Sequence, residues 1–240
     1  MKRLSILILL FSFVADIHSQ KTNVYQSGLL GQENLQAIAS LSPTSPGGMG
    51  FDNRYEGVRG STRLFDTLLS SYMLVKGQEK YIQFESDVDV VRNTIIFRQP
   101  NTGKLMEFTS EIVNELIVIK DDRELIFRTT KGLQFEKDIR ENKFCQLLLE
   151  EPHMFIKVPE KTFVEADYRA AYSADRRYDE FKPFNRYYIK GDDNIFHQVQ
   201  LNRKSLVKIF PDKKEIINKN FKENINETNE DKFVNILQKL

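Results

Sequence analysis

Residues 93–109 read NTIIFRQPNTGKLMEFT, two apolar segments on either side of a polar four-residue turn. Pro100, Asn101, Thr102 and Gly103 favour a tight reversal, so this stretch predicts two antiparallel strands joined as a hairpin. The same pattern recurs from residue 71 onward and predicts roughly ten short strands joined by short turns. The predicted strands cover residues 72–76, 81–85, 93–98, 104–109, 115–120, 124–129, 144–149, 154–158, 163–167, 186–190 and 195–201.

Short connections between these strands exclude parallel crossovers, which need a dozen or more residues. Within residues 81–85, Ile82 and Phe84 point to the same face, as in a half-buried antiparallel sheet. A sheet of about ten strands curls rather than staying flat. We therefore expect a mainly β fold, a curved antiparallel meander that forms a half-barrel, a barrel or a sandwich.

The last thirty residues change from strand to helix periodicity. Pro211 opens a predicted helix with Ile216, Ile217 and Phe221 at helical spacing, and a second apolar stripe follows Thr228. Thr228 lies three residues before Asp231, which is close to a capping box although Asp replaces the preferred Glu. The C-terminus is thus predicted to be a helical hairpin over residues 211–240. It covers part of the sheet or its own small core, and a partner-binding tail is the alternative.

The first twenty residues, MKRLSILILLFSFVADIHSQ, have the layout of a secretory signal peptide. Lys2 and Arg3 precede an apolar run of about twelve residues, which is too short to span a bilayer. Cleavage is expected near Ser19/Gln20, which leaves the mature chain without a transmembrane span. The protein is therefore expected to be exported, and to be periplasmic or associated with the outer membrane.

Four regions follow from these patterns: a signal peptide over 1–19, a poorly ordered segment over 20–50, an antiparallel β domain over 51–210, and the helical hairpin over 211–240. A short helix is expected at about 32–40. Without the signal peptide the chain has 33 basic and 33 acidic residues. This balance argues against nucleic acid as a partner, because nucleic-acid binding needs a basic surface.

Few residues suit catalysis. Cys145 is the only cysteine, so no internal disulfide forms, and its apolar surroundings predict a small buried side chain. Only His153 and His197 remain in the mature chain, which argues against a histidine-rich metal site. His197 is predicted to lie at the surface of a strand. No cofactor is expected. Asp87 and Asp89, two residues apart on one strand face, are the pair that a carboxylate-dependent hydrolase would use.

Tyrosine and arginine residues gather in two segments, and these side chains are the ones that anchor protein interfaces. The first segment is a long connection between predicted strands, where binding residues concentrate. The predicted binding residues are Tyr168, Arg169, Tyr172, Arg176, Arg177 and Tyr178 in this segment, and Arg54, Tyr55 and Arg59 in an earlier one. The alternative is that the tyrosines pack against the sheet.

Two motifs carry a resemblance to known proteins. The first is Glu56-Gly57-Val58-Arg59-Gly60-Ser61 followed by Leu64-Phe65, and the second is residues 202–214, NRKSLVKIFPDKK, which lead into the terminal helices. Together they resemble a group of uncharacterised exported proteins of Bacteroidetes-type bacteria, over about residues 50–240. A tryptophan expected soon after the Leu-Phe pair is absent. The resemblance implies a cell-envelope setting and no particular chemistry.

The sequence therefore favours a non-enzymatic envelope protein that binds or scaffolds another envelope protein through its loops. A second hypothesis is a periplasmic carrier of a lipid or another apolar ligand, held by the curved sheet. A third is the carboxylate-dependent hydrolase.

Overall fold

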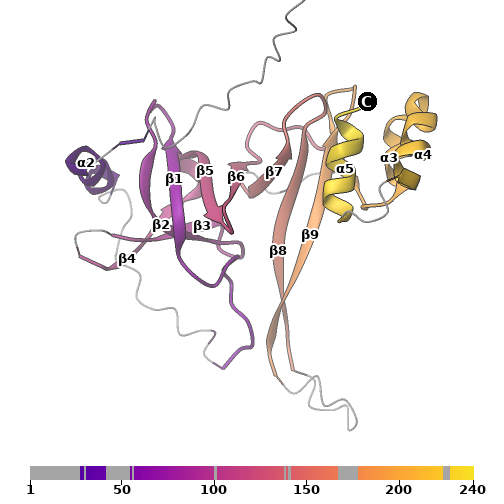
Figure 1. The fold of residues 1–240 in the computed structure, drawn as a ribbon. Helices are drawn as coiled ribbons and strands as arrows, with labels where there is room; N and C mark the ends of the chain where they lie inside the picture. Colours follow the sequence, from indigo (N-terminus) through magenta and orange to yellow (C-terminus); the bar gives the residue numbers. More distant parts are fainter. Residues whose placement is uncertain are drawn as a thin grey trace, which may run out of the picture.

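The computed structural model describes residues 28–29, 31–41, 55, 57–99, 102–137, 139, 142–166, 178–223 and 228–240. Ten strands form one antiparallel sheet in the order β10-β9-β8-β7-β6-β5-β1-β2-β3-β4 (Figure 1). In the described chain the two end strands, β4 and β10, do not pair with each other, so the sheet is open rather than a closed barrel. The strands are β1 (Leu69–Val75), β2 (Ile82–Asp89), β3 (Thr94–Arg98), β4 (Leu105–Thr109), β5 (Val113–Lys120), β6 (Arg123–Thr129), β7 (Phe144–Leu149), β8 (Phe155–Val164), β9 (Glu180–Lys190) and β10 (Phe196–Val199).

Strands β1 to β6 enclose the larger hydrophobic core. Its centre is aromatic, because Phe97 of β3 and Phe108 of β4 stack with their ring centroids 4.0 Å apart. Its fully buried members include Met73, Ile82, Ile95, Phe97, Phe108, Leu116 and Phe127. Large side chains therefore fill the interior of this half of the molecule.

Helix α2 (Gly31–Leu41) lies against β2, close to the helix predicted at 32–40. The Asn34 side-chain amide donates to the Gln83 carbonyl at 2.7 Å and accepts from the Gln83 N–H at 2.8 Å. Since the pairing of β2 with β3 begins only at Glu85, Asn34 takes the place of a neighbouring strand at Gln83. Ile38 of α2 is buried in the larger core.

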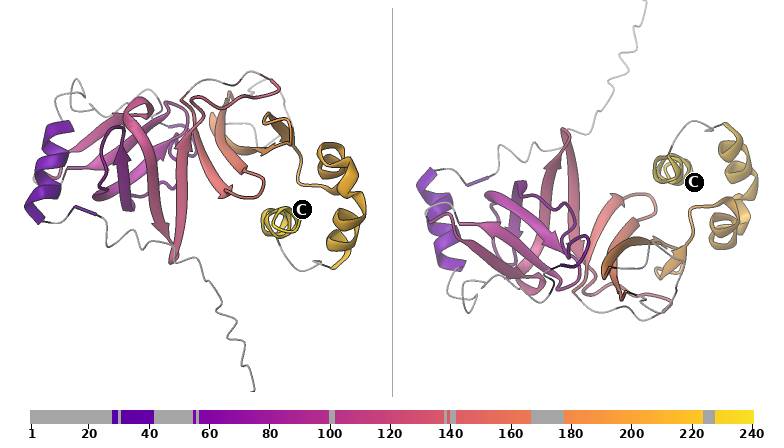
Figure 2. Two further views of the ribbon diagram at one scale, coloured as in Figure 1. Left: turned by 90° about the horizontal axis from the view of Figure 1, so that it is seen from above. Right: turned by 90° about the horizontal axis from the view of Figure 1, so that it is seen from below.

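Strands β7 to β10 pack against the C-terminal helices α3 (Arg203–Ile209), α4 (Lys214–Glu223) and α5 (Asn229–Leu237), as expected for a helical end that covers the sheet. These helices lie at the opposite end of the molecule from α2 (Figure 2). The rings of Phe155 in β8 and Phe233 in α5 have centroids 5.8 Å apart. None of the described helices combines the length and apolar character that a membrane crossing needs.

The helical end differs from the prediction in one respect, since α3 begins eight residues before Pro211. Its start has a local signal, because the Asn202 side chain accepts the N–H of Ser205 at 3.0 Å. At α5 the predicted cap is present: the Thr228 hydroxyl accepts the Asp231 N–H at 3.2 Å. The Asp231 carboxylate in turn accepts the Thr228 hydroxyl at 2.6 Å.

The predicted turn at residues 159–161 and the separate strand at 163–167 are wrong. β8 runs without interruption from Phe155 to Val164, with Pro159 opposite Asn185 of β9. Proline is tolerated in a strand where its missing N–H faces no neighbour. The pairing of β7 with β8 ends at Lys157, so β8 has no neighbour on that side at Pro159 among the described residues. β9 likewise begins at Glu180, six residues earlier than predicted.

Candidate binding surface

Residues 59–66, which we call the strap, cross from β9 to β2. At one end, the Arg59 N–H donates to the Asp179 carbonyl at 2.8 Å, and the Phe181 N–H donates to the Arg59 carbonyl at 2.9 Å. At the other end, the Leu64 N–H donates to the Val88 carbonyl at 2.8 Å. The strap therefore contains most of the first of the two motifs described above, and it links the two halves of the sheet.

The strap also shows how strongly the sheet curves. Arg63 forms an antiparallel bridge with Asp89 of β2, and the Lys161 ammonium of β8 donates to the Arg63 carbonyl. β2 and β8 are five places apart in the strand order, which corresponds to about 24 Å in a flat sheet. One bridge and one lysine side chain span a much shorter distance, so the sheet bends these strands toward each other.

Gly60 permits the close contact between the strap and β9. Its φ of +78° lies in the left-handed region, and an added Cβ would stand 3.2 Å from the Phe181 carbonyl oxygen. Glycine adopts this conformation without steric cost, whereas other residues do so only with strain. The glycine of the Arg59-Gly60-Ser61 motif thus has a structural role.

Asp87 and Asp89, the pair predicted for a hydrolase, are buried and hold the strap in place. Asp89 accepts the Thr62 hydroxyl at 2.6 Å, and Asp87 Oδ1 accepts the Phe65 N–H at 3.1 Å. Asp87 Oδ2 lies 3.7 Å from Arg63 Nε and accepts no hydrogen bond. Burial raises the pKa of Asp87 above the ordinary carboxyl range, against the lowering effect of its backbone hydrogen bonds.

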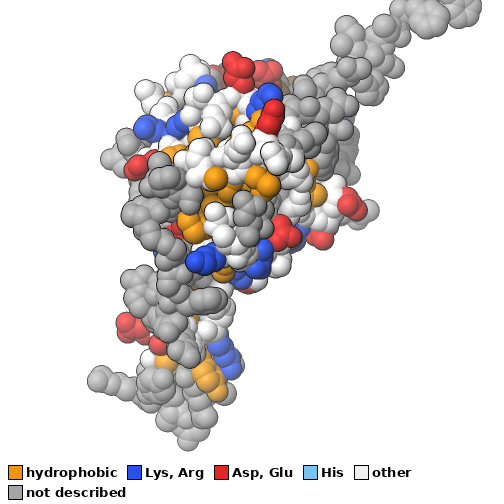
Figure 3. Space-filling model, turned by 90° about the vertical axis from the view of Figure 1, so that its left-hand side faces the viewer, with side chains coloured by type: hydrophobic (Ala, Val, Ile, Leu, Met, Phe, Trp, Pro, Cys, Tyr) orange, Lys and Arg blue, Asp and Glu red, His pale blue; other side chains and the backbone are white. Residues whose placement is uncertain are grey.

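Beyond the strap, the outer ends of β8 and β9 form a two-stranded extension, residues 160–164 and 180–184, which we call the ribbon. Figure 1 shows the ribbon projecting from the rest of the sheet. Four of the five exposed large apolar side chains in the described chain lie on or beside it, and the fifth is Ile216. The four are Phe163, Val164, Tyr178 and Phe184. Figure 3 shows hydrophobic side chains on the projecting part, together with basic and acidic ones.

The structure brings together described residues from the two tyrosine- and arginine-rich segments, Tyr178 from one and Tyr55 and Arg59 from the other. The guanidinium carbon of Arg59 lies 3.8 Å from the centroid of the Tyr178 ring. The Tyr55 ring contacts Phe181 and Phe163, with centroids 4.9 Å and 6.3 Å apart. Residues more than 100 positions apart in the sequence therefore form one surface, with aromatic rings and a guanidinium group at its centre.

Three predicted binding residues, Tyr55, Arg59 and Tyr178, thus lie together. The other six lie outside the described residues: Arg54, Tyr168, Arg169, Tyr172, Arg176 and Arg177. Sequence reasoning missed Phe163 and Phe184 as surface aromatics, whereas Phe181 is buried beneath the Tyr55 ring. Their cross-strand register was the missing information, since Phe163 faces Phe181 only when β8 continues through Pro159.

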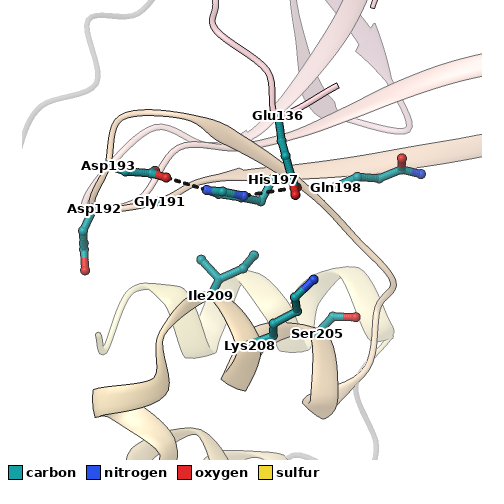
Figure 4. Close-up of a pocket in the computed structure, with 9 residues that line it drawn as sticks. All are labelled: Glu136, Gly191, Asp192, Asp193, His197, Gln198, Ser205, Lys208 and Ile209. Atoms are coloured by element: carbon teal, nitrogen blue, oxygen red, sulfur yellow. Dashed lines mark hydrogen bonds and ion pairs between the residues drawn. The ribbon is translucent and has the colours of Figure 1, made fainter. Parts of the chain in front are cut away.

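A separate polar pocket of about 500 Å³ lies between the β9–β10 turn and α3 (Figure 4). His197, at its wall, is partly exposed as predicted. Its Nε2 lies 2.9 Å from Asp193 Oδ2, and its Nδ1 lies 3.3 Å from Glu136 Oε2. The pKa of Asp193 is lowered, first by the hydrogen bond from the Ile195 N–H and then by His197. Both ring nitrogens therefore contact carboxylates in this arrangement.

The two remaining candidates for catalysis, Cys145 and His153, pack within the fold. Cys145 is buried, as predicted, and its thiol contacts the Arg128 carbonyl at 3.5 Å. Burial raises the pKa of this thiol to about 12, which suppresses the reactive thiolate. His153 packs against Phe210 with centroids 4.5 Å apart. In the described part of the chain, no three or more His, Cys, Asp and Glu side chains are grouped to hold a metal ion.

No protein-family model, curated protein or solved structure matches this chain.

Proposed function

We propose that this protein is an exported, non-enzymatic component of the cell envelope that binds another envelope protein through the ribbon. The single observation that carries the proposal is the set of exposed apolar side chains on and beside the ribbon, where Arg59 stacks on Tyr178. Aromatic and arginine side chains supply most of the energy at protein interfaces. The signal-peptide pattern and the resemblance to exported Bacteroidetes-type proteins support the envelope setting.

The alternative functions receive less support from the described residues. A lipid carrier needs an empty apolar interior, whereas large side chains fill the core between β1 and β6. A carboxylate-dependent hydrolase needs acids that a substrate can reach, whereas Asp87 and Asp89 are buried beneath the strap. The ribbon is the feature that a binding role explains best.

Photocrosslinking tests the proposal directly. A photoreactive phenylalanine analogue replaces Tyr178, and irradiation of the source cells is expected to yield one discrete crosslinked partner. The control carries the same analogue at Glu124, an exposed position on β6 away from the ribbon. Identical products from both positions, or no product from Tyr178, would contradict the proposal.

A pair of surface variants then distinguishes specific binding at the ribbon from nonspecific hydrophobic binding. Phe184→Ser removes an exposed apolar side chain from the ribbon, and Ile216→Ser removes the comparably exposed one from α4. We expect Phe184→Ser alone to weaken capture of the crosslinked partner, by roughly tenfold for an aromatic side chain buried in an interface. Equal effects of the two variants would show that the ribbon has no special role.

A further inference from the structure

We propose that the outer edge of β8, at Lys161 and Phe163, binds an extended segment of the partner protein as an additional β-strand. This inference rests on the proposed function and specifies how the ribbon recognises its partner. Strand addition at an exposed edge combines main-chain hydrogen bonds with contacts to alternate side chains.

The hydrogen bonds of β9 show which of its groups point outward. The Lys190 N–H donates to the Met154 carbonyl, so even-numbered residues of β9 face β8. The Phe181 N–H donates to Arg59 of the strap, so odd-numbered residues face away from β8. The next odd position is Pro183, which has no N–H to donate. The strap and Pro183 together block the outer edge of β9 at the ribbon.

The same alternation leaves part of the outer edge of β8 without a partner among the described residues. Because the Lys190 N–H donates to the Met154 carbonyl, the pairs that exchange hydrogen bonds are the even-numbered ones, from Ile156 with Tyr188 to Val164 with Glu180. The odd-numbered residues therefore direct their N–H and C=O groups away from β9. Pro159 is the first odd position beyond the end of β7. Lys161 and Phe163 follow, and no other described residue bonds to their backbone groups.

The apolar area of the ribbon favours an added strand over a second copy of the chain. Its four exposed side chains have 36% to 49% of their surface exposed. With whole side chains of about 150–250 Å², this amounts to roughly 300 Å² in all. A stable dimer buries about 800 Å² on each partner. Main-chain pairing at an unprotected edge supplies the affinity that this apolar area lacks.

A proline substitution at Phe163 removes the outward N–H while leaving the even-numbered pairing with β9 intact. Phe163→Ala is the matched control, because it removes the same side chain and keeps the N–H. The probe is a synthetic peptide selected from a random twelve-residue display library on the wild-type protein. We expect Phe163→Ala to weaken its binding about fivefold and Phe163→Pro at least about tenfold more, as for an unpaired main-chain group. Circular dichroism checks that both variants fold.

Equal binding by the proline and alanine variants would overturn strand addition, and so would a library that yields no peptide competing with the crosslinked partner. If Phe163→Pro does not fold, amide hydrogen exchange replaces it: the Phe163 N–H of the wild type must gain at least about tenfold protection with peptide. Unchanged exchange would overturn the proposal. If strand addition is contradicted but a partner still crosslinks from Tyr178, the proposed binding function is retained. If no partner crosslinks from Tyr178 in the otherwise wild-type protein, both the binding function and strand addition are contradicted.

Discussion

The guanidinium group of Arg59 lies over the ring of Tyr178, with its central carbon 3.8 Å from the ring centroid. This contact joins the strap to the residue that precedes β9 and fixes the aromatic surface of the ribbon. A cation–π pair at a partly exposed site contributes about 0.5–1 kcal/mol. The pair therefore stabilises the ribbon modestly and orients Tyr178.

A double-mutant cycle measures this contact. Arg59→Ala, Tyr178→Ala and the double variant are compared by urea denaturation. We expect a coupling free energy of about 0.5–1 kcal/mol between the two sites. Additivity within about 0.3 kcal/mol would mean that the stacking makes no contribution in solution.

Gly60→Ala is expected to loosen the strap. Its positive φ costs a non-glycine residue about 1–2 kcal/mol, and the new Cβ also crowds the Phe181 carbonyl. Gly57→Ala is the matched control, because its φ is +85° and no atom of the described residues lies within 4 Å of its added Cβ. Urea denaturation is expected to show the greater loss of stability for Gly60→Ala. Equal losses would show that the approach to β9 is not tight.

Asp87 makes stability depend on pH in a definite direction. Burial raises its pKa in the folded state, so the folded protein holds this proton at a pH where the unfolded chain has released it. The Asp87 contribution to the free energy of unfolding therefore falls as pH rises from the ordinary carboxyl range through the raised pKa. Urea denaturation across this pH range is expected to show this fall in the free energy of unfolding for the wild type and not for Asp87→Asn. Parallel pH profiles for the two proteins would contradict a contribution from Asp87.

Asn93 links the two halves of the sheet through its side chain. Its Oδ1 accepts the Phe144 N–H at 2.9 Å, and its Nδ2 donates to Ser110 Oγ at 2.8 Å and to the Asn142 carbonyl at 2.6 Å. Asn93→Gly keeps its positive φ accessible and leaves these buried groups unpaired, which costs about 2–3 kcal/mol. Asn93→Ala is expected to cost about 1 kcal/mol more, because it also strains the backbone. Thermal denaturation ranks the two variants, and the reverse order would contradict this account.

Much of the fold follows from local patterns. Alternating apolar residues and turn residues predict the strands from β1 to β7 closely, because each hairpin is specified by neighbours in the sequence. The error at Pro159 has a nonlocal cause: proline ends a strand only where a neighbour needs its N–H, and the register of β7 determines that. Asn202 is a good N-cap, yet helix α3 was not predicted, because a helix of seven residues is too short to show a clear helical periodicity.

The candidate surface was predictable only in parts. Tyrosine and arginine content identified Tyr55, Arg59 and Tyr178, yet nothing in the sequence placed the strap beside β9. That contact depends on the curvature of the whole sheet and on Gly60, whose conformation is specified by tertiary packing. The exposure of Phe163 and Phe184 likewise depends on where β7 and β10 end. The local alternation of apolar and polar residues does not predict these strand ends.

Cys145 provides a direct test of how closely the sheet is packed between β6 and β8. Its thiol is 2% exposed and has a pKa raised to about 12, so almost no thiolate forms at pH 8. We expect Ellman's reagent to leave the folded protein unmodified over hours and to react with one thiol within minutes in 6 M guanidinium chloride, since unfolding returns the pKa to about 8.5. Rapid reaction without denaturant would mean that the β6–β7 region opens frequently. Phe163→Pro, which lies beyond the end of β7, is expected to leave this protection unchanged, so the thiol also reports whether that variant keeps its core.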